Sequence, residues 1–563
     1  MSSPISVNLS RFFSLSYDRH QLGIMTVSSL VAYVCYKALT RLIVQPYYSV
    51  LRDLPGPEVD SYIWGHMKKI FNTPAGVAYE EWVAQYGPTF QYRGIGLSRR
   101  FFTLDPKAIA HIVNHPYDYP KPTQYREFLE QYMGKGVLVA EGADHRRQRK
   151  IMNPCFGTAQ IRGLMPIFYT KAFELRDIWL NQMSEHSGET EVDALEGLSR
   201  ATLDVIGLAG FNYDFNALVE GETNELANAF HGLVVPTTSF QVLAFLQYKF
   251  PLLKLIPTER GRAEKKNLEV MNRVGRQLVQ KKKAALLQET IDGGEVVSKD
   301  VVGRDLLSVL ARANMASDIK DSEKMMDEEM MGQITTMLLA GHETTSTSAV
   351  WLLYDLAKPQ NKAIQDKLRA ELWTLSSEQP SMEELNVLPY LDAVIKENLR
   401  LSAAVPALIR EAARDDVIPL SVPIVDRKGI AKHQVRVNKG DSVYVSIIAI
   451  NRDKGIWGDD AHEFNPERWF KPETHPSSSN IPSVYSDIMT FIGGPRHCIG
   501  YRFALMEMKA IVFALVRNMA YSLPNPAPKL GMRSAMVSRP TVILADGTKK
   551  NCMPLIVKAV GGD

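Results

Sequence analysis

The stretch Phe491-Ile-Gly-Gly-Pro-Arg-His-Cys-Ile-Gly500 (FIGGPRHCIG) places one cysteine in a glycine-rich loop directly before a helical pattern at residues 501–516. The sulfur of Cys498 would face the free N–H groups at the positive end of that helix, with Arg496 and His497 beside it, and such surroundings favour the thiolate. The chain has four cysteines, and no partner stands in zinc-ligand spacing with this one. A single axial thiolate is what a haem iron requires for oxygen chemistry, so the loop predicts a haem ligand.

The same string fits the pattern F-x-x-G-x-R-x-C-x-G and resembles the haem-binding loop of the cytochrome P-450 superfamily, most like its fungal microsomal members. The resemblance implies that Cys498 is the axial ligand of the iron of haem b, and that Phe491, Arg496 and Gly500 contact the cofactor. It extends from about Leu54 to the C-terminus, because three further motifs follow in the family's order.

The first of these motifs, Ala340-Gly-His-Glu-Thr-Thr345, lies in the middle of a helix that we expect from about Asp327 to Lys358. Without the resemblance, Gly341 would allow a bulky group to approach the helix, and Glu343 would place an acid beside the hydroxyl of Thr344. The alternative is that the stretch is only a kink or a polar patch in the helix. The resemblance implies an oxygen-activating segment, in which Ala340 and Gly341 border the haem while Glu343 and Thr344 handle protons. A zinc-protease motif is excluded, because Ser346 stands where H-E-x-x-H needs its second histidine.

The second motif is Glu397-Asn-Leu-Arg400, on a segment with helical spacing of its apolar residues. Such a pair alone is usually a solvated surface bridge worth a few tenths of a kcal/mol. The resemblance implies instead a buried structural triad of Glu397, Arg400 and Arg468, the last from Pro466-Glu-Arg-Trp469.

The third motif is His145-Arg-Arg-Gln-Arg149, where many family members carry W-x-x-x-R on a helix that holds the haem propionates. His145 stands in place of the tryptophan, so its ability to donate would depend on its protonation state. The resemblance implies that Arg149 binds a propionate, and it adds Arg410 and Arg496 as further propionate ligands.

The amino-terminal part predicts a membrane anchor. Residues 22–36 carry no charge, and the apolar character resumes after Lys37 and continues to residue 44. The whole stretch is close to the length that spans a bilayer. A cleaved signal peptide or a buried helix is the alternative. We expect a lead at residues 1–21, a transmembrane helix at 22–44, a Pro-rich hinge at 45–57 and one haem-thiolate domain at 58–563. If the amino end is lumenal, Asn8 is a candidate glycosylation site.

Length and composition set wider bounds. At about 150 residues per domain, 563 residues suggest three or four domains, but a helix of more than 30 residues argues for one large body, mainly α with a minor β part such as 443–450. The net charge is +3, which argues against a nucleic-acid-binding function because binding to phosphates requires a strongly basic surface. The cysteine content suits a reducing compartment.

Two segments bear on substrate and membrane. Residues 233–256 are strongly apolar and are either buried core or a membrane-contacting lid over the active site. Residues 260–283 are rich in Lys and Arg, typical of a solvated helix face, with contact to anionic lipid as the alternative.

The sequence therefore predicts a haem-thiolate monooxygenase in the endoplasmic reticulum membrane, single-pass and with a cytosolic catalytic domain. It would oxidise a lipophilic small molecule with O₂ and with electrons from a separate NADPH-dependent reductase, because the chain shows no flavin or nicotinamide domain. Fungal secondary metabolism is the expected setting, with a terpenoid as the expected substrate class. The alternatives are a haem-thiolate isomerase or dehydratase, against which the intact Glu343-Thr344 pair argues, and a non-enzymatic haem sensor or carrier.

Overall fold

The computed structural model describes most of the chain. The described residues are 49–185, 188–233, 258–291, 305–315, 320, 323–471, 481–534, 536–544 and 546–561, together with isolated positions between 25 and 48. Within them the fold is mainly helical with a minor β part, which confirms the predicted class.

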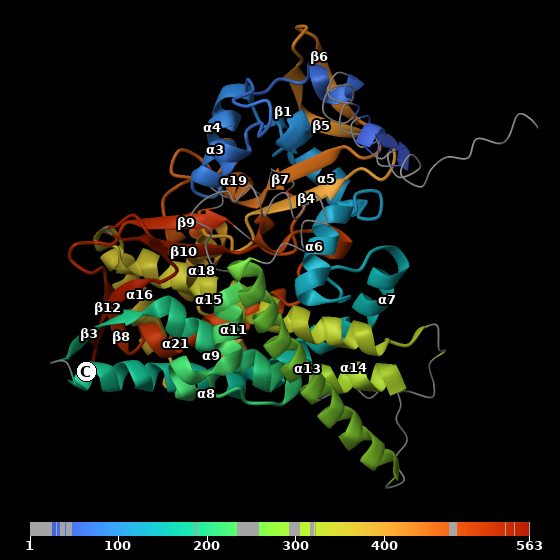
Figure 1. Cartoon of the computed structure of the whole chain (residues 1–563). Helices are drawn as coiled ribbons and strands as arrows, with labels where there is room; N and C mark the ends of the chain where they lie inside the picture. Colours follow the sequence, from blue (N-terminus) through green and yellow to red (C-terminus); the bar gives the residue numbers. More distant parts are fainter. Residues whose placement is uncertain are drawn as a thin grey trace, which may run out of the picture.

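Helices form the larger part of the molecule, in the lower half of Figure 1. They are, in chain order, α3 (Met67–Asn72), α4 (Val77–Tyr86), α5 (Pro106–Asn114), α6 (Thr123–Met133), α7 (Gly142–Met152), α8 (Thr158–Glu185), α9 (Ala194–Phe211), α10 (Ala217–Glu220), α11 (Glu225–Leu233), α13 (Glu259–Ile291), α14 (Leu306–Met315), α15 (Asp327–Ala357), α16 (Lys362–Trp373), α17 (Met382–Asn386), α18 (Pro389–Leu401), α19 (Ile447–Asn451), α20 (Lys454–Trp457) and α21 (Tyr501–Val516).

The strands form four small sheets. Their orders are β1-β2-β7-β4, β11-β10-β9, β3-β12-β8 and β5-β6. Only the pair β2 and β7 is parallel among the described ladders. The bounds are β1 (Thr89–Arg93), β2 (Arg99–Thr103), β3 (Glu189–Asp193), β4 (Ala407–Glu411), β5 (Asp416–Val425), β6 (Ala431–Val437), β7 (Ser442–Ser446), β8 (Met519–Ser522), β9 (Leu530–Ser534), β10 (Ser538–Ile543), β11 (Lys549–Lys550) and β12 (Pro554–Ala559).

The long helix α15 crosses the helical part, as its length predicted. It begins with three acidic residues at its positive end, and Glu329 accepts the N–H of Met326 at 2.9 Å. It stops before Pro359, which cannot continue a helix. Its middle residues are buried on nearly every side against neighbours that include α9 and α21, so a single helix connects much of the core.

The expected strand at residues 443–450 is only half correct. The strand β7 ends at Ser446, and α19 begins at Ile447. The Ser446 side chain accepts the N–H of Ala449 at 3.2 Å and so caps the new helix. The apolar run continues because both elements are buried, which hides the change of period from the sequence.

Several expectations fall on residues that the structure does not describe. Most of the predicted anchor at 22–44 is among them, as are Asn8 and, apart from Leu233, the apolar stretch 233–256. Among the described residues, no helix is both long and apolar enough to cross a membrane. The domain boundaries stay a prediction.

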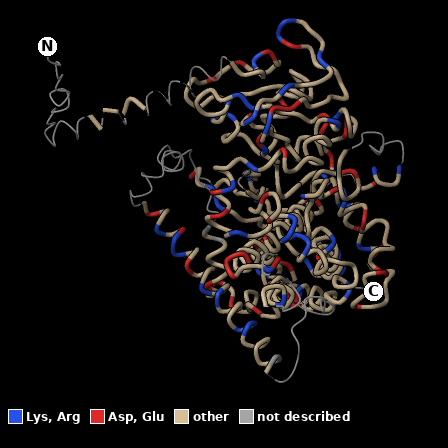
Figure 2. The backbone as a smooth tube through the Cα atoms, turned by 90° about the vertical axis from the view of Figure 1, so that its right-hand side faces the viewer, with Lys and Arg blue, Asp and Glu red and all other residues tan. Residues whose placement is uncertain are grey.

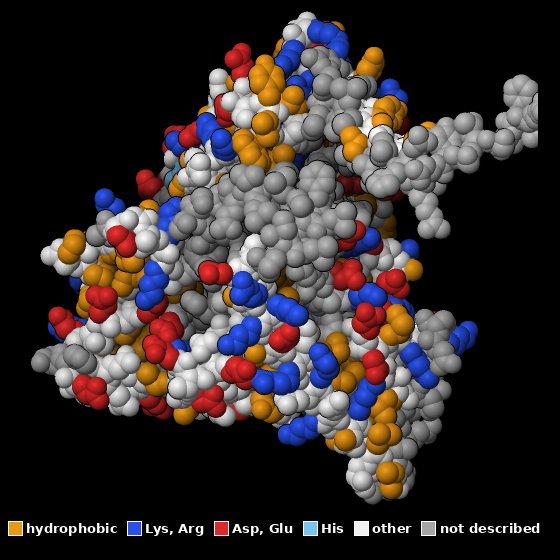
Figure 3. Space-filling view, in the orientation of Figure 1, with side chains coloured by type: hydrophobic (Ala, Val, Ile, Leu, Met, Phe, Trp, Pro, Cys, Tyr) orange, Lys and Arg blue, Asp and Glu red, His pale blue; other side chains and the backbone are white. Residues whose placement is uncertain are grey.

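The basic segment 260–283 lies on α13. Part of its charge is paired: Lys282 contacts Asp305 at 2.7 Å and Lys283 contacts Asp327 at 2.6 Å. Figure 3 shows Lys and Arg grouped over α11 and α13 with acidic side chains among them, and Figure 2 shows both signs interspersed over the helical part.

A buried aspartate joins the start of α5 to a distant strand. Asp105 Oδ1 accepts the N–H groups of Lys107 and Ala108 at 3.0 Å, which caps α5. Its other oxygen accepts the N–H groups of Ser421 and Val422 at 2.8 and 3.0 Å. One carboxylate therefore fixes α5 against β5, more than 300 positions later in the chain.

We expect Asp105→Ala to lower the free energy of unfolding by about 2–4 kcal/mol, because it removes a helix cap and leaves buried N–H groups without an acceptor. Thermal melting of the purified protein measures the effect. The control is Asp546→Ala, since this exposed carboxylate serves only the local turn at Thr548 and should matter by about 0.5 kcal/mol or less. Equal losses in the two variants would contradict the account.

Candidate functional site

The loop that carries Cys498 is closed on itself. The N–H of Cys498 donates to the carbonyl oxygen of Phe491 at 2.8 Å, and the N–H of His497 donates to that of Gly494 at 3.1 Å. Gly494 has φ +70°, and a Cβ there would lie 2.4 Å from the carbonyl oxygen of Val113. The glycine is thus needed where the loop meets the end of α5.

Behind this loop, Glu397 accepts hydrogen bonds from four directions while fully buried. Arg400 donates to both of its oxygens, at 2.9 and 2.7 Å, and Arg468 Nε lies 3.5 Å from Oε1. Trp469 Nε1 donates at 3.1 Å and the N–H of Asn465 at 3.0 Å. The structure therefore brings together the three residues predicted as a triad, away from solvent.

The network reaches the cysteine loop through Asn451. Arg400 Nη1 donates to the carbonyl oxygen of Asn451 at 2.7 Å. The Asn451 side chain accepts the N–H of Met489 and donates to the hydroxyl of Thr490, both at 2.9 Å. These two residues directly precede Phe491, so a continuous set of hydrogen bonds connects α18 to the loop.

The Cys498 side chain is exposed in the polypeptide, yet the surrounding protein desolvates the thiol. Burial raises the pKa of the Cys498 thiol, while the N–H of Gly500 and the charge of Arg149 act in the opposite direction. The helix end therefore acts on the thiol in the direction that the sequence predicts, while desolvation acts against it and is the larger effect in the polypeptide. A coordinated metal supplies the missing charge, since it deprotonates a ligating thiol.

On α15, one turn differs from the rest of the middle of the helix. Ala340, Gly341 and Thr344 are only partly buried, whereas the other residues from 332 to 353 are buried. Positions i, i+1 and i+4 share one helix face. The Thr344 hydroxyl donates to the carbonyl oxygen of Ala340 at 2.7 Å. A Cβ on Gly341 would lie 3.0 Å from the Ile206 side chain of α9, which would have to move slightly to admit it.

The two residues between them point elsewhere. Glu343 is buried and pairs with Arg539 of β10. Burial raises the pKa of Glu343, and the positive charge of Arg539 acts against that shift. His342 is buried beside Phe230 of α11, and its Nδ1 faces the carbonyl oxygen of Leu338, so Nδ1 carries the proton.

Positive side chains gather near the ends of α7 and of the cysteine loop. Arg496 donates to the carbonyl oxygen of Ala140 at 3.1 Å and pairs with Glu141, and Lys121 lies 3.7 Å from the same carboxylate. Burial and then the charge of Arg496 lower the pKa of Arg410 to about 10. Burial followed by Arg410 and Arg496 lowers the pKa of Lys121 to about 7. Arg496 and Lys121 thus share the Glu141 carboxylate, and the buried Arg410 lies near enough for its pKa to respond to both Arg496 and Glu141.

The helix α7 contributes two more groups. His145 is buried, its Nδ1 lies 3.3 Å from the hydroxyl of Tyr117, and burial with the nearby cations lowers its pKa to about 3. It is therefore neutral in the polypeptide at physiological pH. Arg149 Nη1 donates to the carbonyl oxygen of His497 at 2.6 Å, so it holds the residue before the cysteine.

Comparison with known proteins agrees with this geometry. The family model described as cytochrome P-450 matches residues 55–543. Cytochrome P-450 monooxygenases 205 and 128 of Postia placenta are 44% and 43% identical, over 94% and 97% of this chain and 96% and 99% of theirs. Cytochrome P-450 monooxygenase claO of Ampulloclitocybe clavipes is 35% identical over 90% of this chain and 93% of its own.

The chain belongs to the cytochrome P-450 family. It is a haem-thiolate monooxygenase of the fungal type, an oxidoreductase that uses haem b with O₂ and takes electrons from NADPH through a reductase.

The residues present fit the haem of a cytochrome P-450. The thiol of Cys498 is the accessible sulfur that an iron requires. Haem b carries two carboxylates, and the cluster of Lys121, Arg410 and Arg496 has only Glu141 as its counter-charge. In addition, Arg496 Nε is buried without a hydrogen-bond partner in the described structure. A carboxylate at this place would satisfy both the charge and the orphaned donor.

Sequence reasoning missed four residues of the site. Lys121 joins the cationic cluster, Asn451 links the buried network to the cysteine loop, Trp469 donates to Glu397, and Arg539 pairs with Glu343. Trp469 stands inside a motif that was quoted, so its ring nitrogen was a usable signal. The other three come from distant segments and carry no local pattern.

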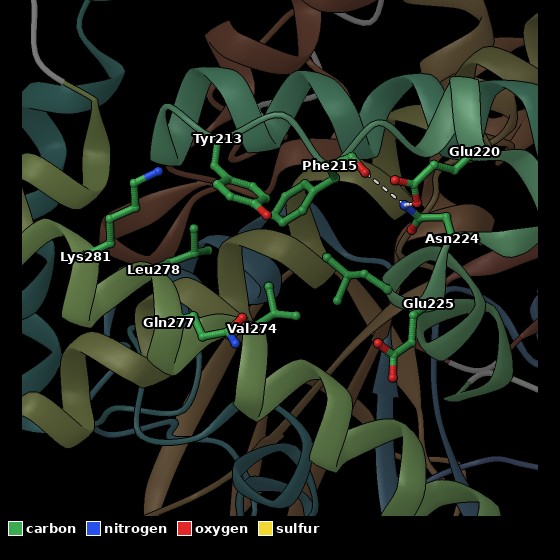
Figure 4. A pocket seen from close by; sticks show the side chains of 10 residues that line it. Tyr213, Phe215, Glu220, Asn224, Glu225, Val274, Gln277, Leu278 and Lys281 are labelled. Carbon is green, nitrogen blue, oxygen red and sulfur yellow. Dashed lines mark hydrogen bonds between the residues drawn. The ribbon is translucent and has the colours of Figure 1, made fainter.

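One pocket of the cytochrome lies apart from all the predicted residues. It has a volume of about 210 Å³ between the segment after α9, α11 and α13. Figure 4 shows Tyr213 and Phe215 side by side on one wall and Val274, Gln277 and Lys281 on another. Asn224 is engaged with the carbonyl oxygen of Phe215 at 2.8 Å.

We expect Glu397→Gln to reduce the haem content of the purified protein several-fold and to cost about 3–5 kcal/mol of stability, because the buried guanidinium of Arg400 loses its counter-charge, whereas Arg468 keeps its pair with Asp460. The ratio of haem to protein absorbance and the thermal midpoint measure this. Glu383→Gln is the control, since its pair with Arg162 is exposed. A normal haem ratio in Glu397→Gln would contradict the structural assignment.

His342 should make the protein sensitive to acid. Burial lowers its pKa from 6.5 to about 4, so the unfolded chain binds the proton more tightly. The stability that depends on neutral His342 is complete above about pH 6.5 and is lost as the pH falls towards 4, by about 2 kcal/mol at pH 5.

The test compares thermal midpoints at pH 7.5 and pH 5. His342→Gln should show a smaller fall than the wild type. The matched control is His115→Gln, an exposed histidine whose Nδ1 also faces the carbonyl four residues earlier, at 2.7 Å. If both variants keep the full fall, the acid sensitivity has another source.

Proposed function

We propose that this cytochrome P-450 is a membrane-anchored enzyme of fungal secondary metabolism that oxidises a lipophilic small molecule. Two observations together support the proposal. The Cys498 thiol just before α21 is accessible, and on the otherwise buried middle of α15 a single turn, Ala340, Gly341 and Thr344, is accessible too. The thiol suits an iron, and the turn presents a hydroxyl next to small residues where O₂ and an apolar substrate are handled.

Each residue then has a defined task. Cys498 would hold the iron, and Phe491 and Gly500 would border the ligand loop. His145, Arg149, Arg410 and Arg496 would hold the propionates. When bound, the haem supplies the redox and oxygen chemistry. Thr344 would donate or accept a proton at its hydroxyl, and Glu343 would pass protons towards it.

The buried triad would act indirectly. Glu397, Arg400 and Arg468 touch neither the thiol nor the accessible turn in the hydrogen bonds described, but they fix Asn451 and thus the start of the cysteine loop. Their loss would first cost haem incorporation and only through it the reaction.

The membrane part of the proposal rests on sequence. The uncharged run at 22–36 followed by apolar residues to 44 favours a single-pass anchor, and the hinge at 45–57 would leave the catalytic domain free in the cytosol at the endoplasmic reticulum. Expression with and without residues 1–57, followed by membrane sedimentation and alkaline wash, tests it. An intact chain that washes off would contradict the anchor.

The substrate class follows from the same features. An anchored domain with an apolar segment at 233–256 suits a compound that partitions into the bilayer, and a terpenoid is the class we propose. Metabolite profiles of cells that express the wild type or Cys498→Ala, which lacks the ligand, identify the compound. An unchanged lipid-soluble fraction would contradict the proposal.

The reaction itself has a direct test. The reduced protein should give a thiolate-type band with carbon monoxide, and NADPH consumption with a microsomal reductase should rise when extracts of lipophilic metabolites are added. Cys498→Ala should abolish both signals. A thiolate band with no extract-stimulated NADPH use would instead favour an isomerase or a haem sensor.

A further inference from the structure

The partner of Glu343 comes from the far end of the chain. Arg539 lies on β10 and is nearly buried, at 7% exposed, and its guanidinium pairs with the Glu343 carboxylate, which is 3% exposed. The strand is fixed against α15, because Trp351 Nε1 donates to the carbonyl oxygen of Ser538 at 3.1 Å. The N–H of Ser538 donates to the carbonyl oxygen of Ala404 at 2.8 Å, which anchors it on the other side. Arg539 therefore has little freedom to leave.

This pair sets where the carboxyl group of Glu343 points. Successive residues of a helix are about 100° apart around its axis. Thr344 lies on the accessible face with Ala340 and Gly341, while Glu343 is buried towards β10. Glu343 is thus held on a face of α15 next to that of Thr344, and the residue that holds it is Arg539 of β10.

The energetic consequence is large for a buried group. Removing one partner of a buried ion pair leaves the other charge uncompensated, which is strongly destabilising unless the group becomes neutral. Without Arg539, desolvation would leave Glu343 uncharged and its direction unfixed. Both changes would alter its use as a proton carrier.

We propose that Arg539 is a positioning residue of the oxygen chemistry: it fixes the Glu343 carboxyl group beside α15 and thereby decides how much of the consumed NADPH ends in water or product rather than in hydrogen peroxide. The inference rests on the proposed function of Glu343 and Thr344 in proton delivery. Arg539 touches no substrate or cofactor in this account and acts only through Glu343.

The electron balance provides a readout that needs no known substrate. When protons arrive efficiently in the absence of substrate, two NADPH, two H⁺ and one O₂ give two NADP⁺ and two H₂O. When they do not, one NADPH, one H⁺ and one O₂ give one NADP⁺ and one H₂O₂. The reductase supplies the electrons in both cases, so the ratio of H₂O₂ released to NADPH consumed reports proton delivery.

The experiment measures this ratio for the full-length holoenzyme with reductase, O₂ and NADPH. All variants are compared at equal concentrations of holoenzyme, as judged from the thiolate-type carbon monoxide band. Arg539→Met should raise the ratio about threefold or more, and Arg539→Lys, which keeps the charge, should recover most of the wild-type value. Lys358→Met is the matched control: it removes the cation 2.6 Å from another buried carboxylate of the same helix, Asp355, and should leave the ratio within about 1.5-fold of wild type.

The outcomes separate the inference from the function on which it rests. A wild-type ratio in Arg539→Met, with a raised ratio in Glu343→Gln and Thr344→Ala, would overturn the inference and leave the proposed function standing. Wild-type ratios in Glu343→Gln and Thr344→Ala would overturn the proposed proton delivery itself. Should Arg539→Met fail to hold haem, Arg539→Gln, which keeps a donor without the charge, takes its place with the same expected rise, and a wild-type ratio there overturns the inference.

Discussion

A carboxylate that is fully removed from water, that of Glu397, is the constraint on which the haem side of this protein depends. It is tolerable there only because Arg400, Arg468, Trp469 and the N–H of Asn465 all donate to it. The same guanidinium of Arg400 reaches the backbone of Asn451, whose side chain fixes the residues before the cysteine loop. The buried charge of Glu397 thus fixes the position of these segments, because the loss of any one of these hydrogen bonds leaves a buried polar group without a partner.

The rest of the site depends on a cluster of positive side chains and on the solvent accessibility of one turn of α15 rather than on the Glu397 network. Lys121 and Arg496 share the Glu141 carboxylate with Arg410 close by, and three neighbouring positive charges are unfavourable until further negative charge is bound. The propionates of haem meet that need. The middle of α15, residues 332–353, is buried except for one turn, so the fold presents Thr344 and small neighbours while it keeps Glu343 in an ion pair with β10.

Much of this could be predicted from the sequence. Local patterns located α15 and α21, because acidic residues, apolar spacing and Pro359 act within a few positions, and the motif resemblance located Cys498 and the triad. The residues 447–450 were misread as strand because a buried apolar run has no visible period. Arg539 and Asn451 could not be found, since their function depends on contacts across more than 30 positions that no local pattern encodes. The desolvation of the Cys498 thiol could not be predicted either, because it is a property of the folded surroundings.

The central claim is that the buried Glu397 network fixes the cysteine loop for its iron. Asn451 connects the Glu397 network to Met489 and Thr490 and makes no described hydrogen bond to Cys498, so Asn451→Ala tests the claim most directly. The measurement is the carbon monoxide spectrum of the reduced protein. The account predicts that haem remains bound while the thiolate-type band gives way to that of a weakened or neutral sulfur ligand, increasingly with temperature. An Asn451→Ala protein with the wild-type band and the wild-type thermal loss of that band would contradict it.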